Sequence, residues 1–312
     1  MLLVLVVAIT VLMLVIPDFM TTGNMHNLLL QVSDLVIVAC GMTFVVLNGG
    51  IDFSVTSVIS FGSVIGALIM SGERGILPDS PWSTPLAILA MVTIGLLVGL
   101  LNGLSVIFLK MPSFIVTLAT QTFFSGLAVV AAKATTIYEL PDSFTAIGTG
   151  SFLKLPVTMW LAVATVAVTH FVLGKTSFGQ KVYLVGTNPR AAYISGLRSR
   201  RVICILFLIS GLCAGLACIV MTSRLQAGSP GLANNMFIDI IACIIIGGNN
   251  IAGGAGSIGN AVIGAIFITV LGNSLNLLGV SWFLIMIIKG SLIVLSVLLV
   301  SKLSTGSAAT SG

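Results

Sequence analysis

Residues 47–57, LNGGIDFSVTS, place a carboxylate and three hydroxyl groups between two long apolar runs. Asp52 follows Gly49-Gly50, where the backbone can leave a helix, and it is followed by Ser54, Thr56 and Ser57. A charged side chain that faces lipid costs roughly 2.5–3.5 kcal/mol even on a modest estimate. If the flanking runs cross a membrane, we therefore expect Asp52 to face the protein interior or an aqueous path. We also expect a broken helix at this point.

Three further ionisable residues fall within apolar runs, namely Asp34, Asp239 and Lys289. Two interpretations fit them. Either carboxylate can pair with Lys289, which is a structural way to bury charge. Alternatively, Asp34 or Asp239 can bind the coupling ion of a secondary transporter. The sequence leaves this choice open.

The residue types needed for covalent catalysis or metal binding are not grouped. His26 and His170 have no plausible partner nearby in the sequence, and the five cysteines show no CxxC or His-paired spacing. No GxxxxGK[ST] phosphate loop is present. We therefore expect a protein that is not an enzyme, with no metal and no cofactor of its own.

One segment, residues 254–259 (GAGSIG), matches the dinucleotide-binding pattern GxGxxG. That pattern requires a preceding strand and an acidic residue about twenty positions further on. Here the segment joins two apolar runs, and no acidic residue follows at that spacing. Its glycines instead predict a tight reversal of the chain.

The composition sets the environment of these residues. Of 312 residues, 57% are hydrophobic and only 7% are charged, and the mean hydropathy is +1.21. Soluble domains carry roughly 25% charged residues. The sequence thus predicts an all-α, polytopic membrane protein, and the net charge of +5 does not indicate nucleic-acid binding.

Charges and Gly/Pro/Asn clusters divide residues 1–302 into about ten transmembrane helices of a single domain, some of them broken or short. The first is read as a span rather than a secretory signal, because it lacks a basic start and a small-residue cleavage site. The eighth is too short to cross a ~30 Å hydrocarbon core. Residues 303–312 are expected to form a flexible tail. The spans lie near 1–17, 27–48, 54–72, 85–109, 113–132, 156–174, 202–222, 237–248, 257–278 and 281–301.

Basic residues orient these spans. The loop 175–201 holds six of the thirteen basic residues and no acidic one, which marks it as cytoplasmic. Counting outward by ten spans places both termini in the cytoplasm and residues 73–84 and 133–155 outside. Within the loop, Asn188-Pro189 predicts the start of a short helix that Gly196 can end. Two interpretations fit this stretch. It can be only a solvated, positively charged part of the loop, or it can be a helix on which a cytoplasmic partner docks.

Small residues recur at four-residue spacing in three spans: Gly62/Gly66, Gly95/Gly99/Gly103 and Gly211/Gly215. Residues i and i+4 share one face of a helix, so each set forms a flat stripe that allows close helix approach. We expect these stripes to pack within one bundle rather than between two copies of the chain.

Five blocks in order resemble the membrane permease subunits of bacterial ABC sugar importers, the family that serves ribose, xylose, galactose and autoinducer-2. The most distinctive is GMTFVVLNGGIDFSVTSV, residues 41–58. The others are LNGLSVIFLKMPSFIVTLAT (101–120), GQKVYLVGTNPRAAYISGL (179–197), IDIIACIIIGGNNIAGGAGSIGNAVIGA (238–265) and NLLGVSWFLIMIIKG (276–290). The resemblance covers nearly the whole chain.

The resemblance implies a permease in the bacterial inner membrane that moves a monosaccharide or related small sugar. It implies a second permease subunit, identical or different, and an extracytoplasmic sugar-binding protein. It also implies a cytoplasmic ABC ATPase that binds ATP and Mg²⁺ and docks on the 179–197 loop. The coupling residues would be Gly186, Asn188, Pro189, Arg190, Ala191, Ala192, Ser195 and Gly196.

A neutral sugar requires hydrogen-bonding groups along its path rather than fixed charge. The candidate path residues are Asn48, Asp52, Ser54, Thr56, Ser57, Asn102 and Gln121. Among them, Asp52 is better explained as an anchor for the broken segment than as an ion carrier. Departures from the family pattern at Asn48 and Thr56, beside Asp52, leave the substrate open, with autoinducer-2 or a nucleoside as alternatives. The departure at Arg190, in the coupling helix, can alter the choice of ATPase partner.

Overall fold

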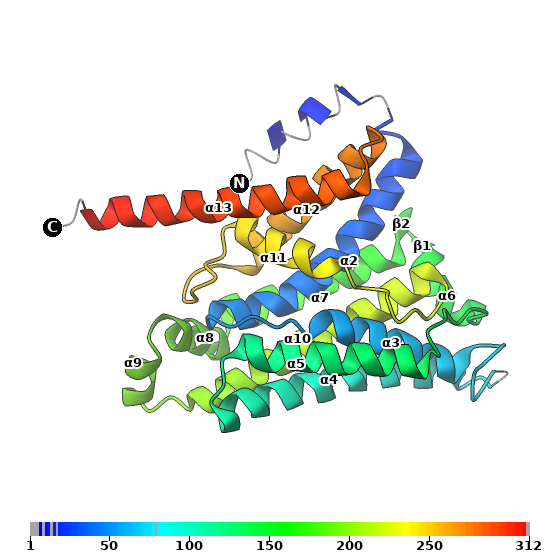
Figure 1. Ribbon diagram of the computed structural model, residues 1–312, viewed down its shortest axis with the longest axis horizontal. Helices are drawn as coiled ribbons and strands as arrows, with labels where there is room; N and C mark the ends of the chain where they lie inside the picture. Colours follow the sequence, from blue (N-terminus) through cyan, green and yellow to red (C-terminus); the bar gives the residue numbers. More distant parts are fainter. Residues whose placement is uncertain (1–5, 8–9, 13–14, 17, 79, 310–312) are drawn as a thin grey trace.

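The computed structural model describes residues 6–7, 10–12, 15–16, 18–78 and 80–309, and it is almost entirely helical (Figure 1). Nine helices coincide with nine of the predicted spans. The predicted first span, 1–17, lies mostly outside the described residues. The nine helices are α2 (Thr22–Leu47), α3 (Val55–Met70), α4 (Ser83–Leu109), α5 (Ser113–Ala131), α7 (Val157–Lys175), α10 (Ser199–Leu225), α11 (Met236–Gly247), α12 (Ile258–Leu277) and α13 (Trp282–Ala309).

Length and hydropathy separate these helices into two groups. Six of the described helices, α2, α4, α5, α7, α10 and α12, are long and apolar enough to cross a membrane. Helices α3 and α11 and residues 282–296 of α13 are shorter apolar segments. With twelve residues, α11 spans only about 18 Å at 1.5 Å per residue, so the prediction of a short eighth span is confirmed. The chain is therefore a multi-pass helical membrane protein.

The C-terminal end of the described chain is helical. Helix α13 continues through residue 303 to Ala309, and residues 310–312 lie outside the described part. The final stretch is rich in Ala and Ser, and Ala is the best helix former, so a preceding helix can extend into it.

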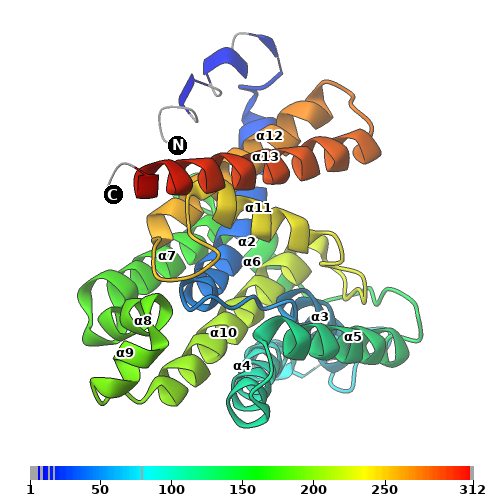
Figure 2. The same cartoon turned by 60° about the vertical axis from the view of Figure 1, so that its left-hand side comes forward.

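Helix α2 runs through the centre of the bundle. It packs against α7, α10, α11 and α12, and almost all of its residues from Val32 onward are buried. Helices α3, α4 and α5 lie together on one side, against α10, while α11, α12 and α13 lie on the other side (Figure 2).

Short elements gather at the two ends of the bundle. One end carries α8 (Ser177–Thr187) and α9 (Pro189–Ile194), which protrude at the left of Figure 1. The opposite end carries α6 (Asp142–Thr149) and a hairpin of β1 (Ser151–Phe152) and β2 (Leu155–Pro156), which are antiparallel. We call these the α9 end and the α6 end.

The predicted glycine stripes pack inside the bundle, as expected. Gly95 of α4 faces Gly211 of α10, and Gly99 faces the backbone at Phe207. At each glycine, an added Cβ would overlap a carbonyl oxygen of the other helix. The absence of side chains on this face thus lets α4 and α10 approach closely along much of their length.

Candidate functional site

Residues 48–54 form the broken segment that the sequence predicts. Helix α2 ends at Leu47 near the α9 end, and the chain then runs back into the bundle before α3 begins (Figure 1). Two hydroxyl groups of α5 form hydrogen bonds with backbone groups of this segment that no helix pairs. The Ile51 N–H donates to Ser113 Oγ at 3.2 Å, and Thr117 Oγ1 donates to the Ile51 carbonyl at 3.1 Å. Irregular backbone at membrane depth requires this kind of protein partner.

Asp52 is the centre of a buried hydrogen-bond network. Its Oδ1 accepts from the Ser54 N–H at 3.0 Å and from Ser54 Oγ at 2.6 Å, and its Oδ2 accepts from Ser210 Oγ at 2.7 Å. Ser210 lies about 16 Å along α10 from its start, so the carboxylate lies well inside the bundle. The network continues through Asn102, which donates to Ser54 Oγ and accepts from Thr120 Oγ1, both at 2.7 Å.

This network ties four parts of the chain together. It joins the broken segment to α4, α5 and α10, and Asp52, Ser54 and Asn102 are each at most 2% exposed. A buried carboxylate with three donors and no access to solvent is suited to anchoring backbone. Asp52 therefore has the geometry of an anchor.

The other predicted path residues lie in two places. Gln121 Nε2 donates to Thr56 Oγ1 at 3.3 Å, and Ser57 Oγ donates to the Ser54 carbonyl at 2.8 Å, so these residues adjoin the Asp52 network. Asn48 lies apart from them, half-buried at the C-terminal cap of α2. The structure thus brings six of the seven together, in a packed region of the chain.

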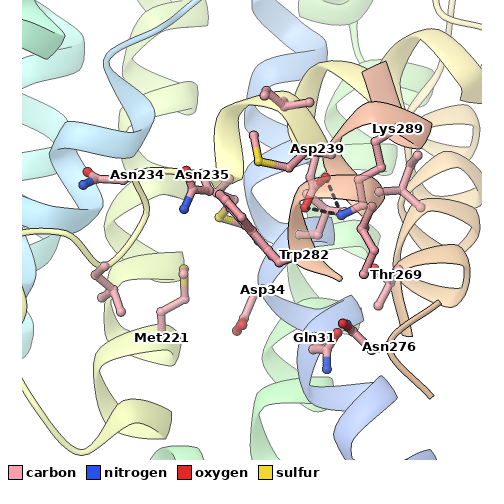
Figure 3. Close-up of a pocket in the computed structure, with 18 of the residues that line it drawn as sticks. Gln31, Asp34, Met221, Asn234, Asn235, Asp239, Thr269, Asn276, Trp282 and Lys289 are labelled. Atoms are coloured by element: carbon pink, nitrogen blue, oxygen red, sulfur yellow. Dashed lines mark hydrogen bonds and ion pairs between the residues drawn. The ribbon is translucent and has the colours of Figure 1, made fainter. Parts of the chain in front are cut away.

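A cavity of about 320 Å³ lies in the half of the bundle nearer the α6 end, and Figure 3 shows most of the side chains that line it. It is enclosed by the N-terminal half of α2, the C-terminal ends of α10 and α12, the N-terminal parts of α11 and α13, and the 226–235 loop. None of the seven predicted path residues lines it. Its volume is at the small end of the ~300–1,000 Å³ typical of ligand pockets.

Two ion pairs lie in the wall of this cavity. Arg224 Nη1 is 2.8 Å from Asp34 Oδ2, which connects α10 to α2. Lys289 Nζ lies 2.8 Å and 3.0 Å from the two oxygens of Asp239, which connects α13 to α11 (Figure 3). The predicted pairing of Lys289 is therefore confirmed for Asp239, whereas Asp34 uses an arginine. The four charges sum to zero.

Four side-chain amides line the same cavity without internal partners. These side chains form no hydrogen bond to any other described residue, and all four residues are exposed. They are Gln31, Asn234, Asn235 and Asn276. Trp282, half exposed, adds an aromatic ring, and in the view of Figure 3 it lies between the Asn234–Asn235 segment and the Asp239–Lys289 pair. The cavity thus combines an apolar surface with uncommitted donors and acceptors.

At the α9 end, the predicted short helix is present. Asn188 is its N-cap, with Oδ1 accepting from the Arg190 and Ala191 N–H groups at 3.1 and 3.0 Å, and Pro189 occupies the first helical position. Gly196 follows the helix with φ +77°. Tyr193 and Ile194 are 78% and 85% exposed.

Ala192, one of the coupling residues that the resemblance implies, does not lie at the surface of the helix. Its side chain is only 4% exposed, because it lies on the inner face of this six-residue helix. The exposed apolar surface is instead formed by Tyr193 and Ile194, with Arg190 also exposed.

Helix α8 connects α9 to the rest of the bundle. Tyr183 Oη donates to the Gly256 carbonyl at 2.7 Å, and the Gly254 N–H donates to the Leu47 carbonyl at 2.8 Å. Burial raises the pKa of the Tyr183 phenol above its ordinary value. The reversal at 253–256 is as tight as predicted, with positive φ at Gly253, Gly254 and Gly256. The Tyr183 hydrogen bond thus connects α8 to this turn, and the Gly254 bond connects the turn to the end of α2.

Several residues of these sites were not singled out from the sequence. Three hydroxyl residues of α5 are spaced four and three positions apart, namely Ser113, Thr117 and Thr120. This spacing places them on one face of a helix, so the sequence pattern could have identified them. Arg224 is a lone basic residue at the end of an apolar run. The amides of the cavity carry no comparable signal, because they come from three separate segments.

The comparisons with known proteins cover nearly the whole chain. The family model described as "Branched-chain amino acid transport system / permease component" matches residues 24–300. The ribose import permease protein RbsC of Haemophilus influenzae is 35% identical, over 96% of this chain and 92% of that protein. RbsC of Bacillus subtilis is 38% identical, over 92% of this chain and 88% of that protein.

A relative with a different printed substrate also matches. The L-arabinose transport system permease protein AraH of Escherichia coli is 32% identical, over 91% of this chain and 84% of that protein. No solved structure matches the chain. The resemblance seen in the five sequence blocks is confirmed by these relatives. The chain belongs to the family of branched-chain amino acid transport system permease components.

Proposed function

We propose that this chain is the membrane-spanning permease subunit of an ATP-binding cassette importer that carries a monosaccharide across the bacterial cytoplasmic membrane. The observation that carries this proposal is the capped, exposed helix α9 at one end of the helix bundle. The relatives of this chain are named as sugar transport permeases. An apolar tip formed by Tyr193 and Ile194 beside Arg190 has the composition of a docking element.

The α9 end is assigned to the cytoplasm. Six basic residues cluster there, between the end of α7 and the start of α10, and basic residues are retained on the cytoplasmic side of a membrane. The α6 end, with the cavity, then faces the outside. This orientation places the C-terminus in the cytoplasm, and the same holds for the N-terminus if residues 1–17 form a span.

The partners follow from this arrangement. A cytoplasmic ATPase docks on α8 and α9 and binds the ATP and Mg²⁺, so this chain needs no cofactor of its own. An extracytoplasmic sugar-binding protein delivers substrate to the α6 end, and a second permease subunit completes the path. The Asp52 network anchors the broken segment 48–54 beside that path.

An ion-coupled carrier is the rival class. It would require a carboxylate available to a proton or sodium ion, and Asp34 and Asp239 are the candidates inside the bundle. Each already forms a 2.8 Å ion pair, with Arg224 and Lys289 respectively. Since their counter-charge is supplied by the protein, this geometry favours the importer.

The docking role is tested by a charge reversal on α9. Arg190→Glu, or deletion of residues 188–196, is expected to abolish sugar-stimulated ATPase activity in the assembled complex, while membrane insertion stays intact. Lys110→Glu is the matched control, because Lys110 is an exposed basic residue between α4 and α5, outside α8 and α9. Undiminished stimulation in the α9 variants would contradict the assignment.

A further inference from the structure

We propose that the cavity at the α6 end is a binding site for one neutral, polyhydroxylated small molecule of pentose size, and that its ion pairs exclude zwitterionic amino acids. The inference rests on the proposed function and deepens it by naming the site and the chemical class it accepts. The distinction matters because the family description mentions amino acids, whereas the matched relatives are named for sugars.

The first argument is the hydrogen-bonding inventory of the cavity. A sugar hydroxyl both donates and accepts, and a side-chain amide does the same. Gln31, Asn234, Asn235 and Asn276 line the cavity and form no hydrogen bonds to other described residues. Four uncommitted amides around about 320 Å³ match several hydroxyls on a small ring.

The second argument is the aromatic surface. Trp282 is 50% exposed and lines the cavity, and its indole offers an apolar face beside the amides. A sugar ring presents C–H groups on its faces and hydroxyls at its edge. An aromatic plane with polar groups around it therefore fits this amphipathic shape.

The third argument is charge. A zwitterionic amino acid needs a free cation for its carboxylate and a free anion for its ammonium group. In this cavity both cations are paired with both carboxylates at 2.8 Å. Binding a zwitterion would require breaking these pairs, which leaves each partner charge to be compensated separately. A neutral ligand requires no such rearrangement.

One carboxylate oxygen in the wall of the cavity is buried without a hydrogen-bond donor. Asp34 is 4% exposed, and its Oδ1 accepts no hydrogen bond from any described residue, although Oδ2 is paired with Arg224. A buried carboxylate oxygen without a donor is unfavourable. Because this oxygen is itself buried, a hydroxyl donor of the ligand would reach it only after a rotation of the Asp34 side chain toward the cavity.

Thiol labelling tests this site directly. Ile238→Cys and, separately, Met286→Cys place a thiol in the cavity without removing any of its four amides, while Thr149→Cys places one at an exposed position of the same end outside it. Background labelling is low, because Cys40, Cys213, Cys218 and Cys243 are buried and Cys204 lies at the start of α10, toward the α9 end. The assay uses the assembled transporter in right-side-out membrane vesicles and a membrane-impermeant maleimide.

Millimolar D-ribose or L-arabinose is expected to slow labelling in the cavity several-fold, and L-leucine is expected to leave it unchanged. None of the three compounds should change the labelling rate of Thr149→Cys. If the vesicles take up D-ribose but neither sugar protects the cavity thiols, or if L-leucine protects them, the inference is wrong while the proposed function stands. If the vesicles take up neither sugar, the proposed function fails and the inference fails with it.

Discussion

The close approach of α4 and α10 gives a quantitative prediction for Gly95→Ala. An added Cβ at Gly95 would overlap the carbonyl oxygen of Gly211, which is backbone and cannot rotate away. The two helices would have to separate by roughly 1 Å to restore van der Waals contact. Overpacking of this kind costs about 1–3 kcal/mol, and it outweighs the ~0.5–1 kcal/mol that Ala gains over Gly in a helix.

Gly126→Ala is the matched control. Gly126 lies within α5, and no atom approaches within 4 Å of the position its Cβ would take. The same substitution should therefore leave stability unchanged or raise it slightly. The pair of variants separates the helix–helix contact from the general effect of replacing glycine in a helix.

Thermal unfolding in detergent with a thiol-reactive fluorophore measures the difference. Four of the five cysteines are buried, so dye labelling reports unfolding, and Cys204 contributes a constant background. Gly95→Ala is expected to melt several degrees below the wild type, and Gly126→Ala at or above it. Equal melting temperatures for the two variants would refute the packing argument.

Three further outcomes follow from the contacts described above. Asp52→Asn removes one acceptor from a buried network in which each hydrogen bond to the charged group contributes about 1.5–3 kcal/mol. The amount of folded protein in the membrane should therefore decrease. A shifted pH optimum for transport with normal folding would contradict the anchor role. Tyr183→Phe removes the bond to Gly256 and should lower ATP-driven uptake with only a small fall in melting temperature, since one hydrogen bond contributes about 0.5–1.5 kcal/mol, whereas Tyr193→Phe should change neither. Asp239→Asn should lower the free energy of unfolding by about 1–3 kcal/mol, which is less than the ~3–5 kcal/mol lost when a fully buried pair is broken. The double variant Asp239→Lys/Lys289→Asp should recover the melting temperature of the wild type. No recovery would refute a direct ion pair.

Much of the fold follows from local patterns in the sequence. Long apolar runs between charged or glycine-rich segments place nine of the described helices within a few residues. Glycines at four-residue spacing identify the α4–α10 contact, and Asn188-Pro189 with Gly196 identifies α9. These features depend on neighbouring residues only, which explains why they can be predicted.

The cavity could not be predicted, because it depends on tertiary contacts. Gln31 and Asn276 are about 245 positions apart, and each is an ordinary amide in its own segment. The pairing of Asp34 with Arg224 depends on the α2–α10 contact. The burial of Ala192 depends on the rotation of a six-residue helix, which is too short to show a periodic pattern.

The central claim is that ATP hydrolysis by a partner drives sugar uptake through this chain. The most direct measurement is D-ribose uptake into proteoliposomes that contain the permease, its ATPase and its binding protein, with ATP and the ion gradient varied separately. The account predicts uptake that requires ATP and persists when ionophores collapse the proton and sodium gradients. Uptake that continues without ATP and stops when those gradients collapse would contradict it.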